Sequence, residues 1–220
     1  CESITKAWFR KSNQKIMVTI VDYGSGNIKA ITNIYKLLKI PFSVASKPLE
    51  LEGAERIILP GVGSFDYCMS KLNNSGLKQV LNRKVIIDKI PVLGICIGLH
   101  LMASESEEGI LPGLGWIQGN VRKFDESKLV FKPKLPHMGW NSIQIKTIPE
   151  LFKGVNQEHG FYFIHSYYIE LENKEDIMTI TNYETDFVSG INKSNIYAVQ
   201  FHPEKSHSNG MKLLQNFSEL

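Results

Sequence analysis

The chain has 220 residues, of which 43% are hydrophobic and 21% are charged. This composition is ordinary for a globular protein, and the length suffices for one domain with a complete hydrophobic core. No apolar run approaches the roughly 18 residues that cross a membrane. The sequence therefore predicts a globular protein that has no membrane partner.

Three cysteines, Cys1, Cys68 and Cys96, are too few and too widely spaced for a disulfide framework or a zinc site. We therefore expect a reducing, cytoplasmic location and no bound metal. The net charge of +3 arises in residues 1–16, which hold four basic residues and one acidic residue, and the remainder is neutral. This distribution gives no support for a nucleic-acid partner. We expect residues 1–16 to be an extension of unknown role and residues 17–220 to form the domain.

In the first half of the chain, strand and helix patterns alternate. Strands are expected at 16–21, 42–45, 56–59 and 92–95, and helices at 28–38, 65–81 and 98–104. Such alternation favours a parallel sheet with helices on both faces.

After Pro112 the pattern changes to that of an antiparallel meander. Strands are expected at 117–124, 141–146, 161–171, 177–183 and 196–201, and a last helix at 209–217. The predicted fold is a three-layer α/β domain whose central sheet is mostly parallel and carries an antiparallel extension.

A glycine-containing turn follows the first predicted strand, at residues 22–27. Gly24 and Gly26 suggest a dinucleotide site, but the fingerprint requires a third glycine where this chain has Lys29. An ordinary turn is the better interpretation, and no cofactor is predicted.

Cys96 stands between glycines, in the segment Gly-Ile-Cys-Ile-Gly of residues 94–98. A predicted strand ends there and a predicted helix begins, so the thiol would face a helix N-terminus, which favours the thiolate. Flanking glycines allow the sharp turn of a nucleophile elbow. The alternative is a buried inert thiol, which is the usual state of a free cysteine.

Among six histidines, His202 has the best position to serve as a base. It ends a predicted strand, where sheet enzymes place catalytic groups, and Pro203 restricts the backbone beyond it. Glu204 shares a face with His202 on an extended backbone and would orient the imidazole. The chemistry therefore predicts a triad of Cys96, His202 and Glu204.

A nucleophile that attacks an acyl carbon requires an oxyanion site. The backbone N–H of Ile97, directly after the nucleophile, is one candidate donor. The second is the N–H of Val62, which lies between two glycines at the end of another predicted strand. An ordinary loop is the alternative interpretation of that segment.

The segments 94–98 and 199–205 resemble the signatures of class I glutamine amidotransferases. Four more segments, 22–27, 60–65, 136–141 and 161–167, resemble the family of glutaminase subunits of imidazole glycerol phosphate synthase. The resemblance runs in order from Met17 to the C-terminus.

This resemblance implies a reaction. Cys96 would attack the side-chain amide carbon of glutamine, His202 would protonate the leaving ammonia, and Glu204 would hold the imidazole. Water would then hydrolyse the thioester, and ammonia would pass to a (β/α)8-barrel cyclase partner of the HisF type.

The resemblance also implies two further sets of residues. The substrate-binding set is His100, Glu108, Ser166 and Tyr167, and the set toward the partner is Asn27, Trp140, Tyr162 and Lys205. The alternative is that the two aromatic residues belong to the core and that Lys205 is only a solvated charge. We expect little activity without the partner, with the Val62 N–H turned inward only in the complex.

His100 departs from the family pattern, because this position normally holds a glutamine that helps to bind the substrate. An imidazole still makes hydrogen bonds but has a different shape. Three alternatives stay open: a paralogue supplying ammonia for amidino-sugar biosynthesis, a non-catalytic scaffold protein, and a free-standing cysteine hydrolase.

Overall fold

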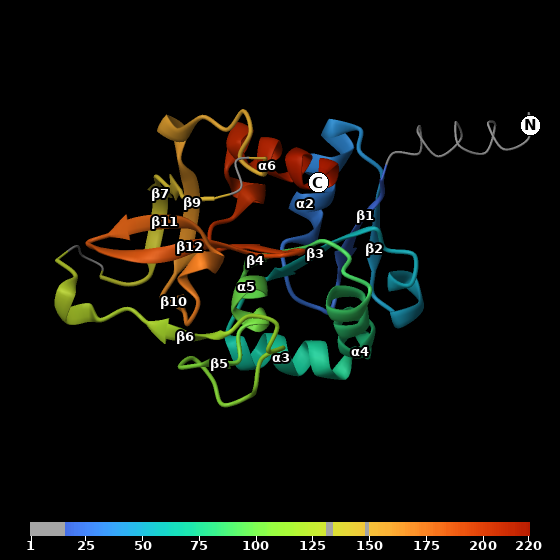
Figure 1. Cartoon of the computed structure of the whole chain (residues 1–220), viewed down its shortest axis with the longest axis horizontal. Helices are drawn as coiled ribbons and strands as arrows, with labels where there is room; N and C mark the ends of the chain where they lie inside the picture. Colours follow the sequence, from blue (N-terminus) through green and yellow to red (C-terminus); the bar gives the residue numbers. More distant parts are fainter. Residues whose placement is uncertain (1–15, 131–133, 148–149) are drawn as a thin grey trace, which may run out of the picture.

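The computed structural model describes residues 16–130, 134–147 and 150–220; the expected N-terminal extension, apart from Ile16, lies outside the described residues. Five strands form a parallel sheet in the order β2-β1-β3-β4-β13 (Figure 1). These are β1 (Val18–Val21), β2 (Phe42–Ala45), β3 (Arg56–Gly61), β4 (Val92–Cys96) and β13 (Ile196–Val199). The predicted parallel sheet is confirmed.

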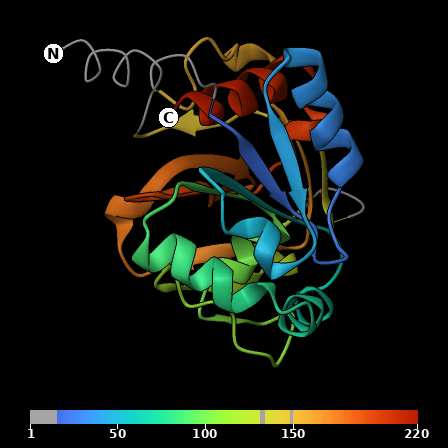
Figure 2. The same ribbon diagram turned by 90° about the vertical axis from the view of Figure 1, so that its right-hand side faces the viewer.

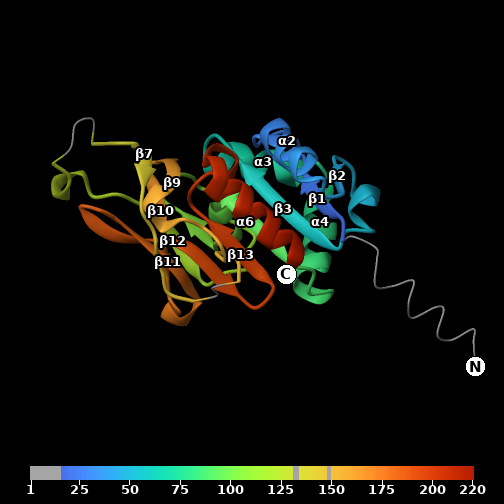
Figure 3. The ribbon, with the colours of Figure 1, turned by 90° about the horizontal axis from the view of Figure 1, so that it is seen from above.

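The extension continues from β13 in the order β12-β10-β6-β5, and its pairs are antiparallel except that of β5 with β6, which is parallel. Its strands are β12 (Thr185–Lys193), β10 (Tyr167–Leu171), β6 (Gly119–Lys123) and the short β5 (Glu105–Ser106), while β11 (Ile177–Tyr183) joins β12 to β8 (Gln144–Ile145). A separate antiparallel pair consists of β7 (His137–Asn141) and β9 (Phe161–His165). Seen from above, this antiparallel part lies at one end of the molecule and the parallel strands at the other (Figure 3).

Helices cover both faces of the parallel sheet, which gives three layers (Figures 1 and 2). One face carries α2 (Ile28–Leu38) and α6 (His207–Glu219). The other carries α3 (Phe65–Asn74), α4 (Leu77–Asn82) and α5 (Ile97–Met102). Short helical turns are η1 (Pro48–Leu51), η2 (Arg83–Ile87), η3 (Glu126–Lys128), η4 (Gln157–His159), η5 (Lys174–Asp176) and η6 (Pro203–Lys205). Within the described residues, no helix combines the length and the apolar character needed to cross a bilayer.

The helix α2 shows how the sequence pattern produces this layering. Its residues Ile31, Ile34 and Tyr35 recur at helical spacing and are buried against the sheet. Burying a side chain such as Ile31 stabilises the fold by roughly 1.5–3 kcal/mol. The hydroxyl of Tyr35 donates to the carbonyl of Leu214 at 3.2 Å, which ties α2 to α6. Figure 2 shows these two helices side by side.

Two predictions of single elements were wrong. The expected helix 65–81 is two helices, because Gly76 adopts a left-handed φ of 74° and ends the helical hydrogen bonding between them. The expected strand 161–171 is also divided, at Ser166. Its first half pairs with β7 and its second half with β6 and β12, so the chain passes from one sheet to the other.

The sequence also missed or displaced other strands of the extension. The strand β12 was missed, because its polar residues interrupt the apolar pattern expected of a strand. The expected strand 141–146 is displaced: β7 ends at Asn141, and the two-residue strand β8 begins at Gln144.

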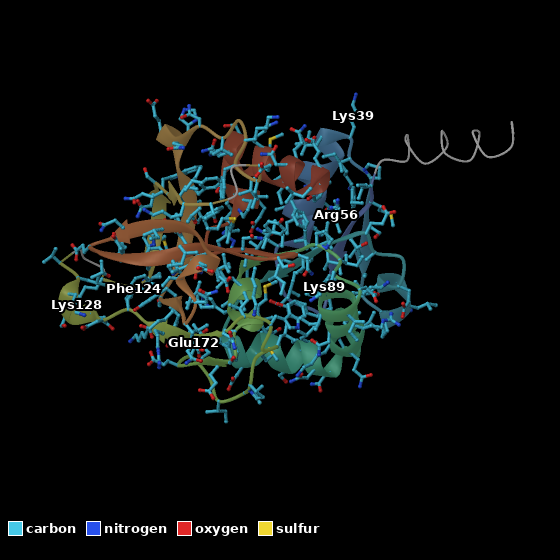
Figure 4. All side chains as sticks on the ribbon, in the orientation of Figure 1. Lys39, Arg56, Lys89, Phe124, Lys128 and Glu172 are labelled. Atoms are coloured by element: carbon cyan, nitrogen blue, oxygen red, sulfur yellow. The ribbon has the colours of Figure 1, made fainter. Side chains whose placement is uncertain are left out.

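The part of the hydrophobic core that lies in the antiparallel sheet is built around Phe124, which Figure 4 labels. The Phe124 ring lies 4.8 Å from the ring centroid of Tyr168, 5.3 Å from that of Phe187 and 5.8 Å from that of Tyr183. Aromatic pairs at such distances add to the free energy of area burial. This cluster fixes the sheet that carries one wall of the cavity described below.

Gly210 allows α6 to pack closely on η6, because a Cβ there would lie 1.7 Å from the carbonyl oxygen of Pro203. On an open helix surface, Gly→Ala stabilises a helix by about 1 kcal/mol. Here we expect Gly210→Ala to lower the free energy of unfolding by about 1–3 kcal/mol, because the clash outweighs helix propensity. Urea denaturation of the variant and of the unaltered protein measures this change in the free energy of unfolding. The matched control is Gly53→Ala, whose Cβ would meet no atom within 4 Å. Equal stability of the two variants would contradict the packing argument.

Candidate active site

A cavity of about 370 Å³ opens beyond the carboxyl ends of the parallel strands. Open parallel sheets place ligand sites at this edge. Strands β3 and β4 lead directly into it, and β13 leads to it through the segment before η6. Its lining consists of Val62, Gly63, Cys96, Ile97, His100, Glu108, Pro136, Ile164, His165, Ser166, Tyr167, His202 and Lys205. The structure thus gathers into one cavity every residue predicted for the oxyanion and substrate sites, with Cys96 and His202.

Cys96 occupies a strained turn between β4 and α5. Its backbone has a φ of 53° and a ψ of −111°, a conformation that residues other than glycine seldom adopt. The turn requires close packing of α5 on β3, since a Cβ at Gly98 would lie 1.8 Å from the carbonyl oxygen of Leu59. The thiol therefore stands at the N-terminus of α5 and reaches the cavity.

His202 and Glu204 form a buried pair beside the cysteine. The Nδ1 of His202 donates to Glu204 Oε1 at 2.8 Å, and both side chains are 2% exposed. Burial alone would lower the pKa of His202, but the Cys96 sulfur and the Glu204 carboxylate outweigh it and raise the pKa to about 10. Near neutral pH the imidazole is therefore protonated, and its Nε2 proton is available to a partner in the cavity.

Two hydrogen bonds fix the backbone of His202. Its N–H donates to the carbonyl of Tyr162 at 2.9 Å, and the hydroxyl of Ser206 donates to its carbonyl at 2.6 Å. The same hydroxyl oxygen accepts the N–H of Tyr162 at 3.0 Å. The imidazole is thus attached to β9 as well as to the end of β13.

The two candidate oxyanion donors differ in their surroundings. Ile97 is the first residue of α5, directly after the cysteine. The N–H of Val62 already donates to the hydroxyl oxygen of Ser25 at 3.1 Å, and that hydroxyl donates back to the carbonyl of Val62 at 2.7 Å. The thiol of Cys68 lies 3.4 Å from the same carbonyl. Ser25, which the sequence did not single out, therefore occupies the Val62 N–H in this structure.

Glu108 brings a carboxylate to the cavity rim. Its Oε2 accepts the N–H of Phe65 at 3.0 Å, and burial raises its pKa, helped by repulsion from Asp66. Ser166 and Tyr167 reach the cavity from the junction of β9 and β10. A carboxylate and a hydroxyl in one cavity suit a ligand that carries an ammonium group and other polar atoms.

His100 is buried, with 1% of its surface exposed, and its Nε2 lies 2.8 Å from Oε1 of Gln200. The sequence missed Gln200, although it lies inside the segment 199–205 that carries the family resemblance. Its Nε2 donates to the Cys96 sulfur at 3.8 Å. Its position two residues before His202, on the same face of an extended segment, was the signal that could have revealed it.

Three of the four residues predicted to face a partner lie together. The rings of Trp140 and Tyr162 are 6.3 Å apart, and the Nζ of Lys205 lies 5.4 Å from the Tyr162 ring centroid. His207 stacks on Trp140, which remains 48% exposed. Asn27 is the N-cap residue of α2. The described part of the chain contains no group of three or more His, Cys, Asp or Glu side chains placed to hold a metal ion.

The family model of class I glutamine amidotransferases matches residues 19–219. The chain belongs to this family. It is 49% identical to the imidazole glycerol phosphate synthase subunit HisH of Bdellovibrio bacteriovorus, over 93% of this chain and all of that protein. It is 46% identical to a subunit named HisH 2 of Methanococcus maripaludis, over 91% of this chain and 98% of that one.

Solved structures agree on the fold. A crystal structure described as a glutamine amidotransferase matches with a TM-score of 0.66 at 18% identity, over 92% of this chain and 97% of that one. The predicted three-layer amidotransferase fold is confirmed. Within the class I family, the chain belongs with the HisH proteins and is a glutamine amidotransferase, as the resemblance implied.

Two buried histidines of this amidotransferase, His137 and His165, form a hydrogen-bonded series that begins at the cavity lining with His165. Asn141 Nδ2 donates to His137 Nε2 at 3.2 Å, His137 Nδ1 donates to His165 Nε2 at 2.9 Å, and His165 Nδ1 donates to the Tyr167 carbonyl at 2.7 Å. Burial lowers the pKa of His137 to about 4 and that of His165 well below its usual value. These rings are therefore neutral at physiological pH.

The free energy of unfolding should fall as the pH drops from about 6.5 to about 4, since the buried histidines bind protons in the unfolded chain before they do so in the folded one. Each contributes up to about 1.4 kcal/mol per pH unit in this window. Urea denaturation between pH 7 and pH 4.5 measures the slope. His137→Phe should reduce it, and the exposed His159→Phe should not. A slope that His137→Phe leaves unchanged would refute this account.

Proposed function

We propose that this chain is the glutaminase subunit of an imidazole glycerol phosphate synthase, acting in the cytoplasm as a heterodimer with a HisF-type (β/α)8-barrel cyclase subunit. Residues 17–220 would form the amidotransferase domain, with residues 1–16 as an extension. The observation that carries the proposal is the buried pair of His202 and Glu204 beside Cys96, where both His202 and Cys96 line the cavity.

In the proposed reaction, the Cys96 thiolate attacks the side-chain amide carbon of glutamine. The carbon–nitrogen bond then breaks, and His202 gives its Nε2 proton to the departing ammonia. Water, deprotonated by the now neutral imidazole, hydrolyses the glutamyl thioester and releases glutamate. Glu204 orients the ring throughout by its hydrogen bond to Nδ1. The scheme uses no cofactor.

Substrate binding is assigned to the polar wall of the cavity. The Glu108 carboxylate would attract the α-ammonium group of glutamine, and the hydroxyl groups of Ser166 and Tyr167 would form hydrogen bonds with its other polar atoms. His100 lines the same cavity.

The surface around Trp140 is the proposed docking site for the cyclase. Trp140 is 48% exposed and Met138, on the same strand, is 59% exposed. Exposed tryptophan and methionine are typical of the central parts of protein interfaces. Tyr162, Lys205 and Asn27 are proposed to lie toward the partner as well. Ammonia released at Cys96 would then pass to the cyclase without entering bulk water.

Glutamate release from glutamine tests the function directly, measured with this chain alone and after addition of a HisF-type subunit with its nucleotide ligand. We expect low activity alone and a large increase in the complex. Cys96→Ser should abolish it, because a hydroxyl beside an imidazolium is a far weaker nucleophile. Cys68→Ser is the matched control and should retain the partner response. Activity that survives in Cys96→Ser would overturn the proposal.

The contact of Ser25 with Val62 suggests how activity stays low without the partner. The second oxyanion donor is occupied by the Ser25 hydroxyl, so a docked partner would have to turn this N–H toward the cavity. One oxyanion hydrogen bond changes the rate by about 100- to 1,000-fold.

We therefore expect Ser25→Ala to raise partner-independent glutamate release several-fold, because the Val62 N–H loses its competing acceptor. The control is Ser43→Ala, which removes a hydroxyl bonded to Thr19 in the strand layer away from the cavity. Unchanged activity of Ser25→Ala without the partner would show that this hydrogen bond does not limit turnover.

A further inference from the structure

The position four residues after the nucleophile holds a histidine that does not end at the substrate cavity but continues to a second buried side chain. His100 Nε2 meets Gln200 Oε1 at 2.8 Å, and Gln200 Nε2 meets the Cys96 sulfur at 3.8 Å. We propose that His100 is a positioning residue that acts through Gln200 to hold the Cys96 sulfur and stabilise its thiolate, an inference that rests on the proposed role of Cys96 as nucleophile.

The packing of His100, Gln200 and Cys96 gives this series of hydrogen bonds a fixed geometry. His100 lies one helical turn after Cys96 on α5, and Gln200 directly follows β13, the strand beside β4. His100 is 1% exposed, and Gln200 has no exposed surface. The backbone N–H of Gln200 donates to the Ser189 carbonyl at 2.9 Å. Neither side chain can turn to water as an alternative partner.

The donors and acceptors of the three side chains allow only one direction for this series of hydrogen bonds. A thiolate only accepts hydrogen bonds, so Gln200 must present its NH₂ group to Cys96 and its carbonyl oxygen to His100. His100 Nε2 must therefore carry the proton, which leaves Nδ1 as a bare acceptor. Among the described residues Nδ1 has no partner, and a buried acceptor without one is less unusual than a buried N–H without one. If the Gln200 amide were turned round, its oxygen would face the thiolate, and two acceptors cannot form a hydrogen bond.

Other titratable groups also act on Cys96. His202, with Glu204 behind it, interacts electrostatically with the sulfur, and so do Tyr23 and Cys68 from neighbouring segments. His100 itself does not titrate near neutral pH, because burial lowers its pKa to about 4. Its effect on the thiolate is therefore constant across the range in which Cys96 can be assayed.

The pH dependence of Cys96 alkylation by iodoacetamide tests the proposal. Modification is quantified by mass spectrometry on the peptide that contains Cys96, in the isolated chain without glutamine. His100→Asn removes the N–H at the Nε2 position, because the asparagine amide is too short to reach Gln200. We expect its alkylation profile to move upward by about one pH unit, which is about a tenfold slower reaction below the midpoint.

His100→Gln provides the matched rescue, since the longer amide carries an N–H to about the position of Nε2. We expect its profile to stay within about 0.3 pH units of the original. The exposed His159→Phe controls for loss of a histidine elsewhere. Coincident profiles for His100→Asn and the unaltered chain, or an equal shift in His100→Gln, would overturn the proposal.

Gln200→Leu provides an independent variant should His100→Asn fold poorly, as judged by circular dichroism. It should reproduce the shift, and adding His100→Asn to it should produce no further change, since both act along one path. Additive shifts would show that His100 does not act through Gln200. Because the assay needs neither glutamine nor a partner, its failure is separate from failure of the proposed glutaminase function.

Discussion

The turn at Cys96 is the constraint on which the rest of the site depends. A residue with a side chain adopts a positive φ there, and the close approach of Gly98 to Leu59 holds α5 against β3 so that the turn persists. Backbone strain of this kind costs on the order of 1–3 kcal/mol and persists only where the surrounding packing requires it. The buried parallel strands β3, β4 and β13 supply that packing. As a result, the Cys96 sulfur lies at the carboxyl edge of the sheet, where the cavity opens.

A second feature of the fold connects this edge to the proposed docking surface. The backbone of His202 is hydrogen-bonded to Tyr162 on β9, and β9 pairs with β7, which carries Trp140. The chain of His137 and His165 spans the same two strands and ends at the carbonyl of Tyr167 in the cavity wall. The exposed face of β7 is therefore connected through a few hydrogen bonds both to the imidazole of His202 and to the cavity wall at Tyr167.

The electrostatics of the site separate one histidine from its neighbours. Burial keeps His100, His137 and His165 neutral, because the loss of water outweighs the hydrogen bonds that His100 and His165 make to Gln200 and to the Tyr167 carbonyl. His202 is buried as well, yet a sulfur and a carboxylate beside it favour the charged form. Near neutral pH, His202 is therefore protonated, while the three neighbouring imidazoles stay neutral and keep their hydrogen bonds.

The sequence by itself determined the parallel half of the fold and the family. Apolar strands, amphipathic helices and glycine-flanked turns are local patterns, and the segments around Cys96 and His202 carry the resemblance in a few contiguous residues. It failed at β12, whose polar residues interrupt the apolar pattern even though β11 and β13 pair with it as sequence neighbours. It also failed to divide strand 161–171, because only pairing with the more distant strands β6 and β7 defines the two halves. Only the tertiary structure brought Ser25 to Val62, and Gln200 between His100 and Cys96. These contacts join residues from different strand ends, and no spacing along the chain encodes the direction in which a buried hydrogen bond points.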